Sequence, residues 1–213
     1  MHAWLCENPV GVDALTWKEL PTPTPGPSQV LIQIEAASLN FPDLLIVQNK
    51  YQMKPELPFV PGSEYAGVVQ AIGDGVTHLK VGQSVACLSG TGGFGTHTLA
   101  PAKLCMPLPA GFSAVDGAAF IMTYATSHHA LVDRAALKAG ETVLVLGAAG
   151  GVGHRSRHLA LADGPQHLED VPLMDPVVLH HVELVNPQFL SQFGDGHGQC
   201  AAAVPRTRGS SQP

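Results

Sequence analysis

Two glycine-rich segments of this 213-residue chain have the spacing of loops that hold the pyrophosphate of a dinucleotide. Such a loop needs a buried strand before it and a helix after it, because backbone N–H groups at the helix N-terminus reach the phosphates. The segment 90–95 (GTGGFG) has every letter of the motif, but the residues after it, THTLAP, alternate like a strand. We therefore expect a turn at 90–95 and no phosphate site.

The second segment, 148–153 (AAGGVG), has alanine in place of the first glycine but stands in the better context. It follows the apolar run 141–146 (ETVLVL), which is typical of a strand buried on both faces. The match is short, and a strand-to-helix turn without a ligand is the alternative interpretation. The candidate cofactor-binding residues of this turn are Gly150, Gly151, Val152 and Gly153.

The four cysteines offer little metal or disulfide chemistry. They lie far apart and form no CxxC pair, which argues against a zinc ribbon or a disulfide scaffold and fits a reducing cytosol. They are Cys6, Cys87, Cys105 and Cys200.

Charge and hydropathy exclude further classes of function. The chain has 11 Lys and Arg against 17 Asp and Glu, a net charge of -6, so binding to a phosphate backbone is not expected. No stretch of about 18 uncharged apolar residues is present, so we expect no membrane span. The first ten residues, MHAWLCENPV, lack the plan of a signal peptide. We expect a cytoplasmic protein.

The helices and strands expected around these residues follow two patterns. Up to residue 112, short β segments alternate with Gly- and Pro-containing turns, which is typical of a barrel-like sheet. A short helix at 40–48 interrupts them, with Pro42 in its first turn. The expected strands are 1–6, 15–19, 29–38, 65–72, 81–88, 96–100 and 104–108.

The pattern changes at Ser113. The residues from Ser113 to Asp116 form a candidate capping box before an Ala-rich helix. A second helix is expected over 125–138, stopped by Gly140, and the strand 141–146 follows it.

Three segments carry a resemblance to a known family: 36–51 (AASLNFPDLLIVQNKY), 57–85 (LPFVPGSEYAGVVQAIGDGVTHLKVGQSV) and 137–153 (LKAGETVLVLGAAGGVG). The chain resembles the zinc-independent branch of the medium-chain dehydrogenase/reductase superfamily, and within it the NADPH:quinone oxidoreductases. The resemblance implies an α/β fold with a GroES-like β-barrel domain at 1–112. An incomplete Rossmann-type dinucleotide-binding domain begins at 113–153. The implied activity is hydride transfer from NADPH to a quinone or an activated enone.

The resemblance also bears on metals. Zinc-dependent relatives place a Cys at the position of Asn40 and a His at the position of Ser63, and neither Asn nor Ser is a normal zinc ligand. The family's lobe of four closely spaced cysteines is also missing. We expect no metal, and Cys87 and Cys105 are expected to be ordinary buried residues.

The family's site residues carry over onto four positions of this sequence. Asn40 matches a polar residue near the nicotinamide, and Tyr51 matches a tyrosine of the cleft that could donate to a reduced oxygen. Asp43 would orient the short helix or the substrate. Thr126 would present its hydroxyl to the nicotinamide amide. Two alternatives stay open: a packing role for Tyr51, and an exposed carboxylate near a helix N-terminus for Asp43.

Residues 154–213 do not share the resemblance. All six lysines precede residue 139, whereas four of the five arginines and six of the eleven histidines follow residue 153. We expect an unrelated tail, either disordered or produced by a change of reading frame. The family's ribose-reading strand and its frequent homodimer surface would lie there, so NADPH rather than NADH rests on resemblance alone. The alternative functions are a non-catalytic GroES-like remnant and an enoyl-thioester reductase.

Overall fold

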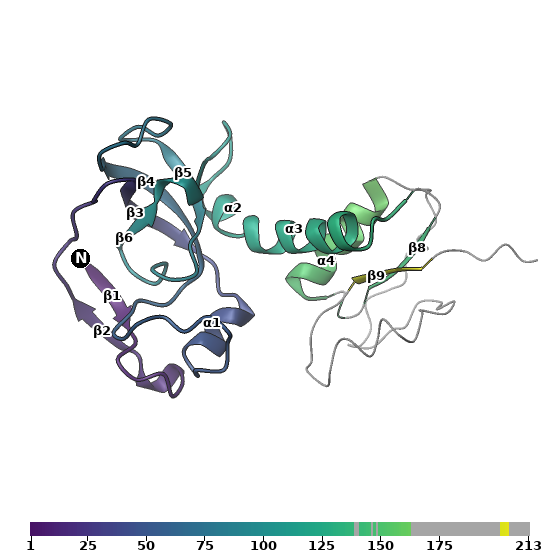
Figure 1. Cartoon of the computed structure of the whole chain (residues 1–213), viewed down its shortest axis with the longest axis horizontal. Coiled ribbons are helices and arrows are strands. Elements are labelled where there is room, and N and C mark those ends of the chain that lie inside the picture. Colours follow the sequence, from purple (N-terminus) through teal and green to yellow (C-terminus); the bar gives the residue numbers. More distant parts are fainter. Residues whose placement is uncertain (139–140, 146, 148, 163–200, 205–213) are drawn as a thin grey trace, which may run out of the picture. The chain divides into compact units, whose positions relative to one another are not determined.

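Two compact units, Met1–Met122 and Thr123–Pro213, divide the chain in the computed structural model. The structure describes residues 1–138, 141–145, 147, 149–162 and 201–204 (Figure 1). We call Met1–Met122 unit 1 and Thr123–Pro213 unit 2.

A five-stranded antiparallel sheet forms the body of unit 1, in the order β6-β3-β4-β5-β7. A two-stranded ribbon of β1 and β2 joins it through a bridge between Ala3 and Gly95. The strands of unit 1 curve around a common interior, as Figure 1 shows. The strands are β1 (His2–Leu5), β2 (Thr16–Glu19), β3 (Gln29–Ala37), β4 (Glu64–Ile72), β5 (Ser84–Leu88), β6 (His97–Pro101) and β7 (Cys105–Pro107).

The core of unit 1 lies inside this curved sheet. Ile32, Tyr65, Val69 and Val85 come from three neighbouring strands, and none has exposed surface. The register of β3 against β4 shifts twice, between Leu31 and Ile32 and between Ile34 and Ala36. Such bulges bend a strand, so they explain why β3 shows only partial alternation of apolar and polar residues.

The helical elements of unit 1 are short: η1 (Val12–Ala14), α1 (Phe41–Ile46), η2 (Ala102–Leu104) and α2 (Ala114–Ala118). The predicted capping box of α2 is confirmed. The Ser113 hydroxyl accepts from the Asp116 N–H at 3.1 Å, and the Asp116 carboxylate accepts from the Ser113 N–H at 3.1 Å. The helix predicted at 40–48 is confirmed as the shorter α1.

Unit 2 contains most of α3 (Ile121–His128), a π-helical turn η3 (His129–Arg134), β8 (Thr142–Val145), α4 (Gly151–Ala162) and β9 (Ala201–Val204). The helix predicted at 125–138 is present with different bounds: α3 and η3 together run from Ile121 to Arg134. Ala136 follows in the left-handed region with φ of 50°, so the helix ends well before Gly140.

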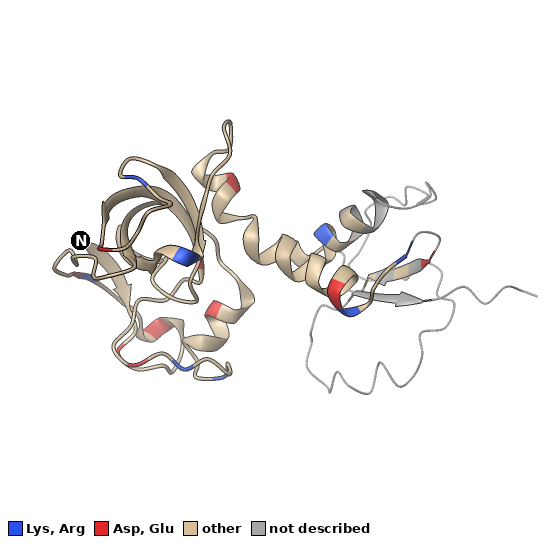
Figure 2. Ribbon diagram, turned by 45° about the horizontal axis from the view of Figure 1, so that its top comes forward, with Lys and Arg blue, Asp and Glu red and all other residues tan. Residues whose placement is uncertain are grey.

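Two elements fall within the segment 154–213: α4 as far as Ala162, and β9, which pairs antiparallel with β8. The rest of that segment lies outside the described residues, so the domain boundary at 153 and the nature of the tail stay predictions. Among the helices that the structure describes, none is both long and apolar enough to cross a membrane. Lys and Arg are interspersed with Asp and Glu over the described ribbon of unit 1 (Figure 2).

Candidate active site

Asn40 stands between the end of β3 and the start of α1, and its side chain is held on one side. The amide nitrogen Nδ2 donates to the Ser38 hydroxyl at 2.8 Å and to Glu64 Oε2 at 3.1 Å. These bonds turn the NH2 group of the half-buried amide toward Glu64. The carbonyl oxygen of the amide is therefore the atom that is turned away from that carboxylate.

The Glu64 carboxylate is fully buried at the first residue of β4. Besides the Asn40 amide, Oε2 accepts from the Ser38 hydroxyl at 2.7 Å, and Oε1 accepts from the backbone N–H of Met122 at 2.9 Å. A buried carboxylate is costly unless it is hydrogen-bonded, and three donors meet that requirement here. Sequence reasoning missed Glu64 and Ser38; the available signal was an acid heading an otherwise apolar strand.

Asp43 is also buried, with 4% of its surface exposed. Its Oδ2 accepts from the backbone N–H of Asn40 at 2.8 Å, and its Oδ1 accepts from the Ser63 N–H at 2.9 Å and from the Ser63 hydroxyl. The alternative of an exposed carboxylate is wrong, although the position near a helix N-terminus is right. Asp43 fixes both the start of α1 and the loop that contains Ser63.

Tyr51 is half-buried and packs against a cluster formed by Cys6, Ile46 and Phe59. This contact favours the packing interpretation of its ring. The role of its hydroxyl at a substrate oxygen stays a prediction, as do the roles of Asn40 and Asp43 in catalysis.

The segment 90–95 is a turn that leads into β6, as predicted. Its N–H groups are used inside unit 1: those of Gly92, Gly93 and Phe94 donate to the carbonyls of residues 60, 62 and 61. Gly93 also approaches so closely that an added Cβ would lie 2.9 Å from the Gly62 oxygen. These N–H groups are therefore not available to a phosphate.

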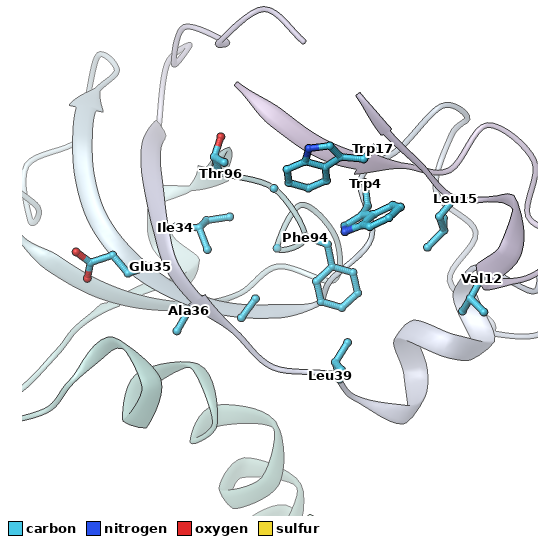
Figure 3. Close-up of a pocket in the computed structure, with 13 residues that line it drawn as sticks. Trp4, Val12, Leu15, Trp17, Ile34, Glu35, Ala36, Leu39, Phe94 and Thr96 are labelled. Atoms are coloured by element: carbon cyan, nitrogen blue, oxygen red, sulfur yellow. The ribbon is translucent and has the colours of Figure 1, made fainter. Parts of the chain in front are cut away.

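An aromatic pocket of about 630 Å3 opens on unit 1 (Figure 3). Trp4 and Trp17 line it with ring centroids 5.5 Å apart, and about half of each side chain is exposed. Phe94 and Ile34 complete the apolar wall that Figure 3 shows. None of the three predicted catalytic side chains lines this pocket.

The second glycine segment has the predicted strand–turn–helix context within unit 2. Gly147 takes a positive φ of 67° after β8, and the N–H of Gly150 donates to the Gly147 oxygen at 2.9 Å. The helix α4 then begins at Gly151, and His154 N–H donates to the Gly150 oxygen at 2.8 Å. The N–H groups of residues 151–153 lie in the first helical turn, where helix geometry supplies no partner, so they suit an anion.

The helix α3 packs closely against this turn. The buried Ser127 hydroxyl lies 2.9 Å from the Val152 oxygen and 2.8 Å from the Thr123 oxygen, so it can donate to either. A Cβ added at Gly151 would lie 3.0 Å from the Thr123 methyl, which makes this glycine part of the packing. Sequence reasoning missed Ser127, since a helical serine carries no sign of burial.

Two further side chains of unit 2 lie on α3 and α4. Thr126 is exposed on α3, and its contact with a nicotinamide stays a prediction. Arg155 of α4 lies 4.5 Å from the ring centre of Tyr124 on α3. This is a cation–π contact between the two helices.

Within the described ranges, no group of three or more His, Cys, Asp and Glu side chains is arranged to hold a metal ion. The three cysteines of these ranges, Cys6, Cys87 and Cys105, are free thiols.

Comparisons with known proteins agree with this architecture. Residues 26–110 match the alcohol dehydrogenase GroES-like domain. The chain is 40% identical to rat quinone oxidoreductase over 143 residues, which cover 67% of this chain and 44% of that protein. It is 38% identical over 146 residues to a mycocerosic acid synthase-like polyketide synthase of Mycobacterium tuberculosis, covering 67% of this chain and 7% of that protein.

Among solved structures, the quinone oxidoreductase of Thermus thermophilus, determined alone and with NADPH, superposes with a TM-score of 0.67 at 33% identity. The match covers 76% of this chain and 50% of that one. The chain thus spans less than half the length of the curated quinone oxidoreductase that it matches. It belongs to the medium-chain dehydrogenase/reductase family as a partial, quinone oxidoreductase-like member, with a GroES-like domain followed by the first part of a Rossmann-type domain.

Proposed function

We propose that this chain is part of a cytoplasmic, NADPH-dependent oxidoreductase that reduces a quinone or an activated enone without zinc. The observation that carries the proposal is the pair of buried hydrogen-bond networks at Asn40 and Ser63. The Asn40 amide is committed to Glu64 and the Ser63 hydroxyl to Asp43. Residues held in this way support a polar site rather than a metal site.

The cofactor part of the proposal rests on the turn between β8 and α4. The N–H groups of the first turn of α4, which follows this glycine turn, fit a pyrophosphate. Gly150, Gly151, Val152 and Gly153 would hold that group, and the exposed hydroxyl of Thr126 would bind the carboxamide of the nicotinamide. NADPH, when bound, supplies the hydride.

The residues of unit 1 would act on the substrate. The Asn40 amide, oriented by Glu64, would present its carbonyl oxygen as an acceptor for the hydroxyl of a hydroquinone product, because a quinone itself carries no donor. The Tyr51 hydroxyl would donate a hydrogen bond to the oxygen that gains negative charge during reduction, which stabilises the transition state. Asp43 would act as a positioning residue, because its carboxylate fixes the backbone of Asn40 and the loop of Ser63.

A second candidate function, reduction of an enoyl thioester, is favoured by one observation. The chain is 38% identical to a segment of a mycobacterial polyketide synthase, against 40% for a quinone oxidoreductase, and its fold matches that of a solved enoyl reductase. Both reactions place a hydride on a carbon conjugated to a carbonyl, so the fold alone does not choose between them.

The test is steady-state oxidation of NADPH by the full chain with three acceptors: a benzoquinone, an α,β-unsaturated ketone and an enoyl thioester. We expect turnover of the first two to survive EDTA and to fall about tenfold or more in Tyr51→Phe, the scale of losing one hydrogen bond in a transition state. Lys54→Ala, an exposed change in the same loop, is the matched control. Preference for the thioester would favour the second candidate. Absence of both turnover and NADPH binding would leave the non-catalytic GroES-like remnant.

A further inference from the structure

Two cysteines far apart in the sequence lie directly opposite each other in unit 1. Cys87 of β5 and Cys105 of β7 are Cα partners in the antiparallel register. No local pattern predicts this pairing, since 17 residues separate the two cysteines in SVACLSGTGGFGTHTLAPAKLC. The distance between two opposite residues of an antiparallel pair depends on which type of pair they form, a hydrogen-bonded or a non-hydrogen-bonded one.

The hydrogen-bond pattern of the two strands defines that type. Leu108 N–H donates to the Ser84 oxygen at 3.0 Å, so Ser84 and Leu108 form a hydrogen-bonded pair. This pair is the neighbour of the Val85–Pro107 pair. Antiparallel pairs alternate, so the Val85–Pro107 pair is not hydrogen-bonded, as a proline without N–H requires. Two positions further on, the cysteine pair is again a non-hydrogen-bonded site.

Non-hydrogen-bonded sites bring opposite residues closer together, with Cα atoms about 4.5 Å apart. A disulfide needs Cα atoms about 4.4–6.8 Å apart. Cys87 and Cys105 are therefore at a backbone spacing that a disulfide can bridge without a change of register.

Both side chains also point to the same side. Cys87 is fully buried and Cys105 is 4% exposed, and both belong to the core cluster that contains Tyr65. The neighbouring Cys105 thiol lowers the pKa of Cys87 by hydrogen bonding, against the opposing effect of burial. The pKa of Cys105 is raised by the same contact. This difference makes Cys87 the sulfur that ionises first.

Access to the pair comes from the edge of the sheet. The strand β7 is three residues long and has a neighbour on one side only. Its next residue, Met106, is 46% exposed. A strand this short at an edge is where local opening costs least, and such an opening would give a small oxidant access to the thiols.

We propose that Cys87 and Cys105 are a redox-active pair that a peroxide converts into a cross-strand disulfide. The Cys87 thiolate attacks one peroxide oxygen, the O–O bond breaks, and one water leaves after protonation, giving a sulfenic acid. The Cys105 sulfur then attacks the Cys87 sulfur, the S–S bond forms, and the sulfenic oxygen leaves as a second water. The two sulfurs lose two electrons in total, and the peroxide gains them. A dithiol reverses the reaction.

The test uses the full chain, reduced and then treated with hydrogen peroxide, alkylated with N-ethylmaleimide and digested with trypsin. Cleavage after Lys80, Lys103 and Arg134 separates the two cysteines into peptides 81–103 and 104–134. We expect a species with the summed mass of both peptides less two hydrogens, which dithiothreitol abolishes. The number of alkylated cysteines should fall from four to two.

Variants complete the test. Cys87→Ser and Cys105→Ser should each abolish the linked species, whereas Cys6→Ser, in a separate core cluster, should leave it unchanged. If a variant fails to fold, recovery of the linked peptides from the wild-type chain decides the test. Failure to recover the linked peptides while Cys87 and Cys105 are alkylated or singly oxidised would overturn the proposal, as would linkage of either cysteine to Cys6 or Cys200.

Discussion

Glu64 holds the side chain of Asn40 from within the core of unit 1: its Oε2 accepts the Asn40 amide N–H at 3.1 Å. The same oxygen accepts the Ser38 hydroxyl, and the other accepts the Met122 N–H. Asn40, which we propose to contact the substrate, is thus oriented by a carboxylate that has no exposed surface. The stability of unit 1 and the geometry of its site depend on the same side chain.

Glu64→Gln should destabilise unit 1 by about 1–3 kcal/mol. Both carboxylate oxygens of Glu64 accept hydrogen bonds, so the NH2 group that replaces one of them would face a donor and lose that bond. Urea unfolding followed by tryptophan fluorescence measures this directly, since both tryptophans, Trp4 and Trp17, lie in unit 1. The control is Glu35→Gln, an exposed carboxylate of β3, which should change the free energy of unfolding by less than about 0.5 kcal/mol. Equal effects of the two changes would contradict this role of Glu64.

Asp43→Asn should cost more than Ser63→Ala. The first change leaves an NH2 group facing backbone or hydroxyl donors, whereas the second removes one donor and leaves the Ser63 N–H on Oδ1. We expect about 2 kcal/mol or more for Asp43→Asn and about 1 kcal/mol for Ser63→Ala, measured by the same urea unfolding. The reverse order would show that the hydroxyl bond, and not the carboxylate as a whole, fixes the loop to α1.

Two buried serines of unit 2 should respond in opposite directions to alanine. The Ser156 hydroxyl on α4 is buried without a hydrogen-bond partner, so Ser156→Ala should stabilise the helix by about 1 kcal/mol. Ser127→Ala should destabilise the packing of α3 on the glycine turn by about 1 kcal/mol, because the hydroxyl that can donate to the Thr123 or Val152 oxygen is lost. Amide hydrogen exchange over 121–134 and 151–156 measures both. Slower exchange in Ser127→Ala would contradict the packing of α3 on the glycine turn.

The capping box of α2 predicts a pH effect. Hydrogen bonds from the Ser113 hydroxyl and N–H lower the pKa of Asp116 below its ordinary value. A carboxyl whose pKa is lower in the folded state stabilises that state above its ordinary pKa, and the contribution disappears as the pH falls through the lowered value. An NMR titration should find the pKa of Asp116 below the usual range and raised toward it in Ser113→Ala. An unchanged pKa in that variant would contradict the capping role.

The sequence predicted the elements better than the side-chain networks. Strand positions follow from apolar runs and from proline and glycine between them, which are local signals. The capping box of Ser113 and Asp116 is local as well, because both partners lie within one helical turn. Glu64 was missed because its donors come from two segments far apart in the chain, Ser38 and Asn40 in one and Met122 in the other.

The same reasoning explains two other differences. The end of the helix at Arg134 depends on a π-helical turn and on the left-handed Ala136, and an alanine gives no sign of either. The pairing of Cys87 with Cys105 depends on the register of β5 and β7, which no local pattern reports. The glycine turn at 148–153 was found because strand, glycines and helix are contiguous in the chain.

The most direct measurement is a fluorescence titration of the full chain with NADPH. We predict a saturable change in the wild-type chain that is lost in Gly151→Val, because a side chain there would collide with Thr123 and displace the glycine turn. The exposed change Val132→Ala, in the same unit, should leave the titration unchanged. A wild-type chain with native tryptophan fluorescence and no saturable change would contradict the proposed function, as would equal binding by Gly151→Val.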